Sequence, residues 1–266
     1  RTQLPYVVSL RGGDVPGFEP EVEGFHLLLK PIRRFVYRNA ISVVANSKSL
    51  ATLSERSDPF AVKVIPNGVN TNIFCPGSRR REPGESLKVL MVSRFHAQKQ
   101  IPDALKMLRA AQEEGIDIHL FLVGEGPEQG AILDAIKNLG MNEVVSLTGW
   151  LTKEKLVSAY QSADCFVSLS AYEGMPNSVL EAMACQLPVV LSNIKPHREL
   201  VRDQENGFLI ENSNPRAFIS VLKRIGKRDD ELKQLEKRAR QTVEQQFSWP
   251  ASAASYISLF EKEPRL

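Results

Sequence analysis

The 266-residue sequence lacks several features that define other protein classes. No uninterrupted apolar run is long enough to cross a membrane, and no secretory signal opens the chain. Cysteine is scarce: the chain has Cys75, Cys165 and Cys185. Their number is odd and their spacing is not that of metal ligands. The formal net charge of +3 is too small to indicate nucleic-acid binding. We therefore expect a cytoplasmic protein with reduced, mostly buried thiols and no nucleic-acid partner.

Histidine is equally sparse. His96, His119 and His197 are scattered, so the sequence shows neither a metal-ligand cluster nor a Ser–His–Asp arrangement. His119 lies inside an apolar stretch and is expected to be a packed or edge residue. We found no internal repeat or low-complexity tract. The chain begins at Arg1, directly before an expected strand, so we expect that further residues precede it.

Short apolar strands alternate with amphipathic helices along most of the chain, and this alternation becomes regular after residue 86. Strands are expected at residues 5–10, 41–45, 62–65, 87–92, 118–123, 144–147, 164–169, from 189 and at 207–210. Helices are expected at residues 24–39, 47–56, 102–114, 127–139, 153–161, 176–185, from 215 and at 250–263. Near-continuous apolar strands between helices predict a parallel sheet covered on both faces.

The charged segment 76–86 contains Arg79-Arg80-Arg81 together with proline and glycine, and is the best candidate for a linker. It would separate a unit at 1–75 from a larger one at 87–247. The helix at 24–39 carries several basic residues between its apolar ones. Such a helix can lie on an anionic membrane surface. We favour the alternative, in which the basic residues form the solvated side of a packed helix.

The stretch from Leu169 to Leu191 organises the rest of the chain. An apolar strand ends in a polar turn, a helix begins near Pro176, and another apolar strand follows Pro188. The loop and the helix N-terminus direct backbone N–H groups at one point, which suits phosphate or other electron-rich oxygen atoms. Glu173 on the loop and Glu181 on the helix flank that point. Anion donors beside carboxylates suit a ligand with both phosphates and hydroxyls, such as a nucleotide sugar.

Other strand ends are expected in the same crevice, because ligands of parallel sheets bind at the carboxyl ends of strands. Arg94 and Lys99 follow one strand and could both reach a diphosphate, although either could also be a solvated surface charge. Gly124-Glu125-Gly126 departs from the dinucleotide fingerprint, so we interpret it as a tight turn near the ligand. Arg11-Gly12-Gly13 follows the first strand and is either a ligand-contacting turn or a plain connection.

Together these residues resemble the family 4 retaining glycosyltransferases of the GT-B type. The signature is the Glu-x7-Glu spacing of Glu173 and Glu181. Supporting matches, in chain order, are Asn46-Ser47, residues 64–70, Ser93-Arg94-Phe95 with Lys99, residues 123–127, residues 147–150 and Phe247-Ser248-Trp249. The resemblance implies an α/β fold in which a Rossmann-like, nucleotide-sugar-binding domain follows the second half of an N-terminal Rossmann-like domain. Residues 248–266 would form a helix crossing back toward that N-terminal domain.

The resemblance also implies roles for individual residues. Arg94 and Lys99 would contact the donor diphosphate, and Glu181 the ribose hydroxyls. Glu173 and the loop from Gly174 through Met175 and Pro176 to Asn177 and Ser178 would hold the sugar. Gly124 would lie near the donor, Gly149, Trp150 and Leu151 would border the base, and Arg11, Gly12 and Gly13 would face the sugar or acceptor. The donor would be UDP- or GDP-linked, and no cofactor or metal is expected.

The expected activity is transfer of a hexose-like sugar, with retention, to a lipid-linked or glycan acceptor in glycolipid or polysaccharide synthesis. Family members have roughly a hundred further N-terminal residues. Residues 1–75 would then leave unpaired sheet edges and exposed apolar helix faces, allowing peripheral contact with the inner membrane face or dimerisation. Many members also have a histidine where this chain has Arg11. These departures favour an active full-length enzyme and an inactive fragment. The alternative is a nucleotide-sugar-binding module without transferase activity.

Overall fold

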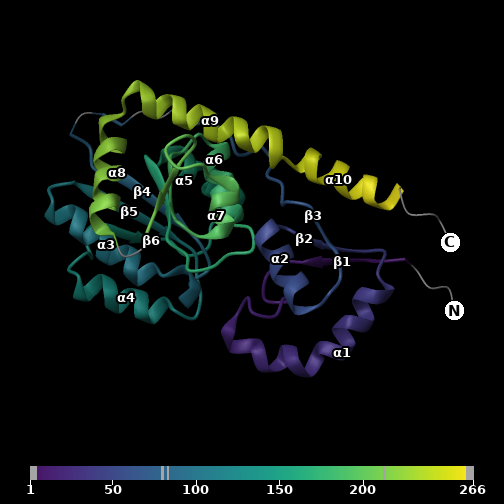
Figure 1. Cartoon of the computed structure of the whole chain (residues 1–266). Helices are drawn as coiled ribbons and strands as arrows, with labels where there is room; N and C mark the ends of the chain where they lie inside the picture. Colours follow the sequence, from purple (N-terminus) through teal and green to yellow (C-terminus); the bar gives the residue numbers. More distant parts are fainter. Residues whose placement is uncertain (1–4, 79–80, 83, 212–213, 262–266) are drawn as a thin grey trace.

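The computed structural model describes residues 5–78, 81–82, 84–211 and 214–261 (Figure 1). Parts of the predicted linker, Arg79, Arg80 and Pro83, therefore lie outside the described residues, as do residues 1–4 and 262–266 at the ends of the outermost predicted segments. Within the described ranges, the strands form two separate parallel sheets. The smaller sheet has the order β1-β2-β3, with strands Val7–Leu10, Ser42–Ala45 and Val62–Val64.

The larger sheet has the strand order β6-β5-β4-β7-β8-β9. Its strands are β4 Leu87–Val92, β5 Ile118–Val123, β6 Val145–Leu147, β7 Cys165–Ser168, β8 Val189–Ser192 and β9 Phe208–Ile210. The chain builds outward from β4 to β6 and then returns to place β7 on the other side of β4. Val89 accordingly pairs with Leu120 on one side and Cys165 on the other. This reversal is the topological switch point at which open parallel sheets bind ligands.

Helices cover both faces of the larger sheet, which explains why its strands are predominantly apolar. The helices of this half are α3 Ile101–Glu113, α4 Gln129–Asn138, α5 Lys153–Ser162, α6 Asn177–Ala184, α7 Lys195–Leu200, α8 Pro215–Lys227 and α9 Asp230–Gln246, with the short 3-10 helix η2 Ala97–Lys99. One core cluster joins the sheet to Leu105 of α3 and Phe218 of α8. The other joins it to Leu180 of α6 and Val243 of α9.

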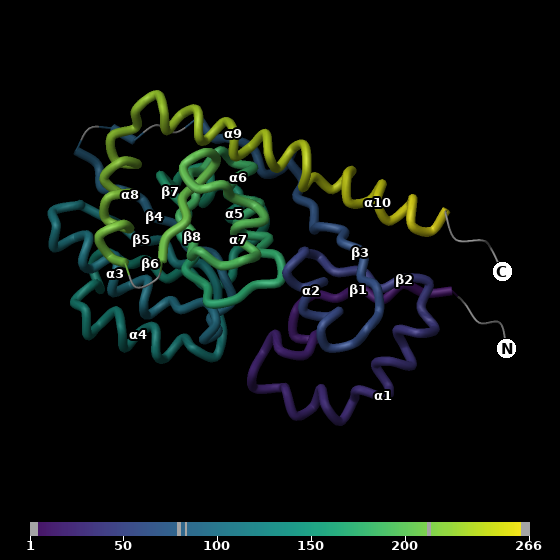
Figure 2. Tube along the Cα trace, in the orientation of Figure 1, coloured from purple at the N-terminus to yellow at the C-terminus, as the bar shows by residue number. Residues whose placement is uncertain are grey.

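The smaller sheet is flanked by α1 Glu23–Asn39, α2 Lys48–Ser57 and the 3-10 helix η1 Pro20–Val22. The last helix, α10 Trp249–Glu261, continues from α9 and extends over this sheet (Figures 1 and 2). Its Ser252 Oγ donates to the Pro66 carbonyl at 2.6 Å. Leu259 packs with Val44 and Ile65. The end of the chain is thereby fixed to its beginning.

A carboxylate also joins the two halves. Glu199 of α7 accepts hydrogen bonds from the backbone N–H groups of Lys48 and Ser49, each at 2.7 Å. These groups open α2, where the Ser47 side chain also caps the helix by accepting from Leu50 N. A negative charge at this position satisfies free donors and complements the helix dipole. Glu199 therefore holds α2 against the larger domain.

Helix α1 differs from the favoured prediction. Its large apolar side chains are 45–75% exposed, at positions Phe25, Leu27, Leu28, Leu29, Ile32 and Phe35. Among its described residues, Tyr37 alone is buried. The prediction of solvated basic residues on a packed helix was therefore wrong. Among the described residues, no element covers this apolar side, which agrees with the exposed apolar helix faces that the family resemblance implies.

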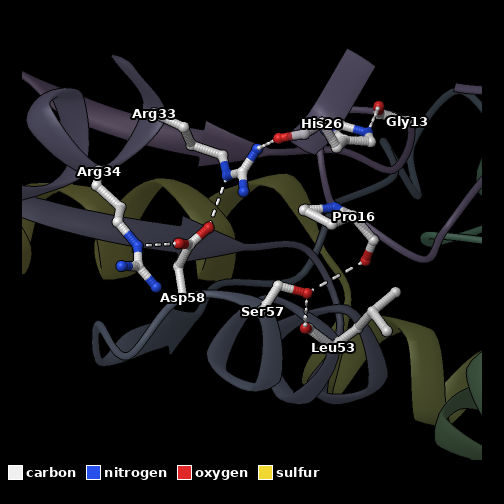
Figure 3. A network of polar contacts seen from close by, with 8 residues as sticks. All are labelled: Gly13, Pro16, His26, Arg33, Arg34, Leu53, Ser57 and Asp58. Atoms are coloured by element: carbon white, nitrogen blue, oxygen red, sulfur yellow. Dashed lines mark hydrogen bonds and ion pairs between the residues drawn. The ribbon is translucent and has the colours of Figure 1, made fainter. Parts of the chain in front are cut away.

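Two of the basic residues of α1 instead form an internal anchor. Figure 3 shows Arg33 and Arg34 converging on the buried Asp58, with Nε to carboxylate distances of 2.7 and 2.6 Å. Burial alone would raise the pKa of Asp58, but hydrogen bonds from Arg34 and Arg33 outweigh it and lower the pKa. The pair of guanidinium groups thus ties α1 to the end of α2.

Candidate active site

A pocket of about 850 Å³ lies at the switch point between the two halves. We call it the large pocket. It collects the loops that follow β4, β5 and β7, together with the loop that follows β1 in the smaller sheet. Of the predicted site residues, those lining it are Arg11, Gly12, Gly13, Arg94, Lys99, Gly124, Trp150, Leu151, Glu173, Gly174, Met175, Pro176, Asn177, Ser178 and Glu181. Residues separated by up to 170 positions therefore face one cavity.

Gly149 is the predicted site residue that does not line the large pocket. Its carbonyl accepts a hydrogen bond from Gly124 N at 3.0 Å. A Cβ at Gly149 would lie 3.0 Å from Glu125 Oε1, and its φ is +66°. Gly149 thus supports the adjoining loops rather than facing the cavity.

Glu173 is buried at the base of the pocket and forms an ion pair with Lys99. Lys99 Nζ lies 2.5 Å from Glu173 Oε1, and both side chains are largely shielded from water. The sequence placed these residues in the same crevice but assigned them to different ligand groups. In the structure they contact each other directly.

The loop that carries Glu173 is fixed from two sides. Ser192 Oγ donates to the Ser170 carbonyl at 2.6 Å, and Ala171 N donates to the Gln98 carbonyl at 2.8 Å. The second bond ties the loop to η2, the element that also presents Lys99. Backbone bonds to both neighbours therefore set the position of the Glu173–Lys99 pair.

His197 supports the same loop from beneath. It is fully buried, and its Nδ1 lies 2.8 Å from the Ser192 carbonyl and 3.1 Å from Ser192 Oγ. Burial lowers its pKa, and this effect outweighs its bond to the Ser192 backbone. Its Nε2 has no hydrogen-bond partner among the described residues. The neutral ring, with the proton on Nδ1, satisfies this geometry.

Glu181 lies on α6, where Tyr160 OH donates to its Oε2 at 2.9 Å. Burial raises the pKa of Glu181 to about 7, although the hydrogen bond from Tyr160 opposes this rise. The carboxyl group therefore titrates near neutrality in the free protein. When ionised, it can accept hydrogen bonds from two neighbouring hydroxyls of a ligand.

The first turn of α6 adds donors to this site. Pro176 occupies the N-cap and makes no side-chain capping bond. Val179 N donates to the Pro176 carbonyl, so within the described residues the N–H groups of Asn177 and Ser178 are left for another partner. Gly174 approaches the opposite wall closely, since a Cβ there would lie 2.4 Å from the Arg11 carbonyl. Only glycine fits at this crossing between the two halves.

A chain of polar side chains also crosses the cleft. The Arg11 guanidinium donates to Asn67 Oδ1, and Asn67 Nδ2 donates to Asn177 Oδ1 at 2.8 Å. Arg11 thus contacts the α6 side of the pocket through Asn67. The Pro66-Asn67-Gly68 turn was recognised in the sequence as part of a family match, but nothing there indicated that its side chain bridges the pocket.

The β4 and β5 loops complete the pocket. Arg94 is exposed and makes no side-chain hydrogen bond or ion pair with any described residue. At Gly124, which has a φ of +137°, a Cβ would lie 1.8 Å from the Ser93 carbonyl, so the loops can approach only because it is glycine. Trp150 is 71% exposed at the pocket wall. It offers an aromatic face to a planar ligand group.

Comparison with known proteins identifies the family. The sequence model described as "Glycosyl transferases group 1" matches residues 78–242, well over half of the chain. The chain belongs to this family. The putative colanic acid biosynthesis glycosyltransferase WcaL of Escherichia coli K12 is 28% identical over 207 residues, covering 75% of this chain and 51% of that protein. The chain thus spans about half the length of that relative.

A second relative covers nearly all of the chain. The N-acetyl-alpha-D-glucosaminyl L-malate synthase of Bacillus anthracis is 27% identical over 266 residues, which is 97% of this chain and 68% of that protein. Among solved structures, Anabaena HepE in complex with UDP and glucose superposes with a TM-score of 0.83 at 20% identity. The match covers 97% of this chain and 72% of HepE. The predicted GT-B type α/β fold is confirmed by these structural matches.

Within the described residues, no group of three or more His, Cys, Asp or Glu side chains could hold a metal ion. The helices of that same part of the chain include none long and apolar enough to span a membrane. Cys75, Cys165 and Cys185 are free thiols, and Cys165 and Cys185 are buried.

Proposed function

We propose that this chain carries the donor site of a retaining glycosyltransferase that moves a sugar from a nucleoside diphosphate to an acceptor hydroxyl. The observation that carries the proposal is the large pocket, where the carboxylates include Glu173 and Glu181, the cations include Arg94 and Lys99, and the N-terminus of α6 faces the same cavity. Phosphates require cations and N–H donors, whereas sugar and ribose hydroxyls require acceptors. A nucleotide sugar combines both requirements.

Each group has a role consistent with its surroundings. Arg94, whose side chain has no partner in the part of the chain that the structure describes, would bind the diphosphate, joined by Lys99. Glu181 would accept the ribose hydroxyls, which favours its ionised form. Glu173 and the backbone N–H groups of Gly174, Met175 and Asn177 would hold the transferred sugar; Pro176, between them, has no N–H. Trp150 and Leu151 would border the base, and Arg11, Gly12 and Gly13 would lie on the acceptor side.

The reaction we infer keeps the configuration of the sugar. The bond between the anomeric carbon and the diphosphate oxygen breaks, and the acceptor oxygen forms its bond on the same face. The acceptor proton moves to the departing diphosphate oxygen. Arg94 and Lys99 would stabilise the charge that develops on this group. Retention rests on the family resemblance, whereas the stabilisation follows from the positions of the two cations.

The donor is expected to be UDP- or GDP-linked, and the acceptor a glycan or lipid-linked sugar. HepE was crystallised with UDP and with UDP-glucose, and WcaL is named for colanic acid biosynthesis. These names support polysaccharide or glycolipid synthesis as the setting. The relatives are named as transferases or synthases, so we do not favour a binding module without transferase activity.

Donor screening of the full-length protein tests the proposal. Transfer from one UDP- or GDP-linked sugar to an acceptor should be measurable and should fall at least about a hundredfold in Glu173→Ala. Nucleotide binding without transfer by the full-length protein would support the binding-module alternative. No binding of any nucleoside diphosphate would contradict the proposal itself.

A further inference from the structure

A second pocket of about 440 Å³ lies beside the large pocket. We call it the side pocket. One wall is formed by α2 and the turn at Gly17 and Phe18 in the N-terminal half. The other is formed by Ala171 and Tyr172 after β7 and by residues 193–198 at the end of β8 and the start of α7. It therefore lies at the same carboxyl edge of the sheet, one strand further along.

Three cations line the side pocket: Arg56 from α2, and Lys195 and Arg198 from α7. Their side chains form no hydrogen bond or ion pair with any of the described residues, and all three are exposed. They come from two separate parts of the chain that the fold brings together. Such a cluster of like charges carries an electrostatic cost that a bound anion removes.

Among the described residues, no carboxylate forms an ion pair with these three cations. Glu19 and Glu21 lie close enough to Tyr172 to help raise its pKa, but they do not line the side pocket. Glu173 is the acidic residue that lines it, and its carboxylate is paired with Lys99. Glu199 follows Arg198 in the chain, but its two oxygens accept from Lys48 N and Ser49 N. The positive charge of the side pocket is therefore available to a ligand.

The side pocket adjoins the site proposed for the transferred sugar. Glu173 and Phe18 line both pockets. The rings of Phe18 and Tyr172 meet edge to face, with centroids 5.4 Å apart, and help to form the partition. A molecule in the side pocket would thus have one end at the cations and the other near Glu173.

We infer that the side pocket binds the acceptor, and that this acceptor carries an anionic group, phosphate or carboxylate, near the hydroxyl that it presents. This inference rests on the proposed function, because the large pocket must hold the donor. Arg56, Lys195 and Arg198 bind the anionic group, and the hydroxyl reaches past Phe18 to the sugar held at Glu173. The cations fix the acceptor without taking part in bond cleavage.

Equilibrium binding of sn-glycerol 3-phosphate tests this site, with glycerol as the neutral analogue. Saturating UDP is present throughout so that Arg94 and Lys99 are occupied. We expect glycerol 3-phosphate to bind and glycerol not to bind. The double variant Lys195→Gln/Arg198→Gln should weaken binding by about tenfold or more, as expected for lost charge-assisted hydrogen bonds.

The matched control is Arg216→Gln/Lys227→Gln, which removes the same charge from exposed positions on α8. Binding of glycerol 3-phosphate should be unchanged in this control. Equal weakening in both double variants would show a general charge effect and overturn the assignment. Unchanged binding in Lys195→Gln/Arg198→Gln would overturn it as well. A parallel titration without UDP completes the test, because glycerol 3-phosphate that binds only in the absence of UDP would occupy the large pocket and overturn the assignment.

The anionic group could belong to a soluble small molecule or to the headgroup of an anionic lipid. Sedimentation with phosphatidylglycerol vesicles, compared with phosphatidylcholine vesicles, separates these sources. Vesicle binding that depends on Lys195 and Arg198, without binding of glycerol 3-phosphate, assigns the pocket to a lipid headgroup. Binding of neither probe overturns the inference.

If the proposed function is wrong but the side pocket does bind an anion, the binding measurements give a different result. UDP would then fail to bind, while glycerol 3-phosphate binding still depended on Lys195 and Arg198. If both sites are correct, the full-length enzyme shows a raised KM for an acidic acceptor in Lys195→Gln/Arg198→Gln. Its kcat and its KM for the donor remain unchanged.

Discussion

Lys99 and Glu173 form an ion pair at 2.5 Å across the base of the large pocket, joining the loop after β4 to the loop after β7. The pair brings together a cation expected to bind diphosphate and a carboxylate expected to bind sugar. In the free protein, therefore, the Lys99 ammonium group and the Glu173 carboxylate are each paired with the other rather than with a ligand. Under the proposed assignment, the donor diphosphate competes with Glu173 for Lys99, so the pair should have a measurable effect on nucleotide affinity.

Glu173→Gln should therefore separate binding from transfer. Without the carboxylate, Lys99 becomes free and the negative charge near the diphosphate disappears, so UDP or GDP should bind roughly threefold to tenfold more tightly. Sugar transfer by the full-length protein should nevertheless be lost. Isothermal titration calorimetry with an activity assay checks both effects. Glu114→Gln, which breaks the exposed pair with Lys223, is the control and should change neither.

Glu181 should make nucleotide binding depend on pH around neutrality. Because burial raises its pKa to about 7, the carboxyl group is largely protonated at pH 6 and ionised at pH 8. Ribose hydroxyls donate best to the ionised form, so affinity should increase as the pH rises through 7.

Two variants check this assignment. Glu181→Gln should flatten the pH profile. Tyr160→Phe removes the hydrogen bond that opposes the rise in pKa, so the midpoint should move above that of the unmodified protein. An unchanged profile in Glu181→Gln would show that another group titrates.

His197 should make the fold sensitive to acid. Burial lowers its pKa in the folded state, whereas in the unfolded chain it is near the ordinary value of about 6.5. The unfolded state therefore takes up the proton first. The contribution of His197 to the free energy of unfolding should be constant above about pH 7 and fall by roughly 1 kcal/mol per pH unit below about 6.5. Glu181, whose pKa burial raises to about 7, contributes in the opposite sense over this range, so the loss caused by His197 is the difference between the unmodified protein and a His197 variant.

Urea unfolding between pH 5 and pH 8 measures this loss. In His197→Asn, where the amide can still donate to the Ser192 carbonyl, the acid loss should be smaller. His96→Gln at an exposed position is the control and should retain the full loss. Identical pH profiles for all three proteins would contradict the role of His197.

Gly174 should tolerate no side chain. A Cβ there would lie 2.4 Å from the Arg11 carbonyl and 3.4 Å from Asn46 Nδ2, so Gly174→Ala must separate the two walls of the pocket. We expect a loss of about 1–3 kcal/mol in the free energy of unfolding and weaker nucleotide binding. Gly130→Ala is the matched control, since its Cβ would meet nothing within 4 Å and it lies in α4. That change should be neutral or slightly stabilising.

The sequence was sufficient to predict the strands and helices where the pattern of apolar residues was strong. Strands β4 and β5 occupy the predicted residues 87–92 and 118–123, because parallel strands covered on both faces form near-continuous apolar runs, interrupted here only at Lys88 and His119. Helix α1 was misread for a related reason. The spacing of its apolar residues predicts that one side of the helix is apolar. It cannot show whether another part of the chain packs against that side.

The site was predicted as a set of residues but not as a set of contacts. Strand ends placed Arg94, Lys99 and Glu173 in one crevice, as the parallel sheet requires. The Lys99–Glu173 pair, the support from Tyr160 and the bridge through Asn67 depend on side-chain directions across loops, which spacing does not encode. His197 is a further example, since its role depends on burial beneath a loop 22 residues earlier in the chain.

Calorimetric titration with UDP and GDP tests the central claim most directly, comparing the unmodified chain with Arg94→Gln and with Arg216→Gln. Arg94 is the unpaired cation assigned to the diphosphate, and Arg216 is an exposed arginine on α8. The account predicts that at least one nucleotide binds, that Arg94→Gln weakens it by about tenfold, and that Arg216→Gln has no effect. Absence of binding by both nucleotides, or equal affinity in Arg94→Gln, would contradict it.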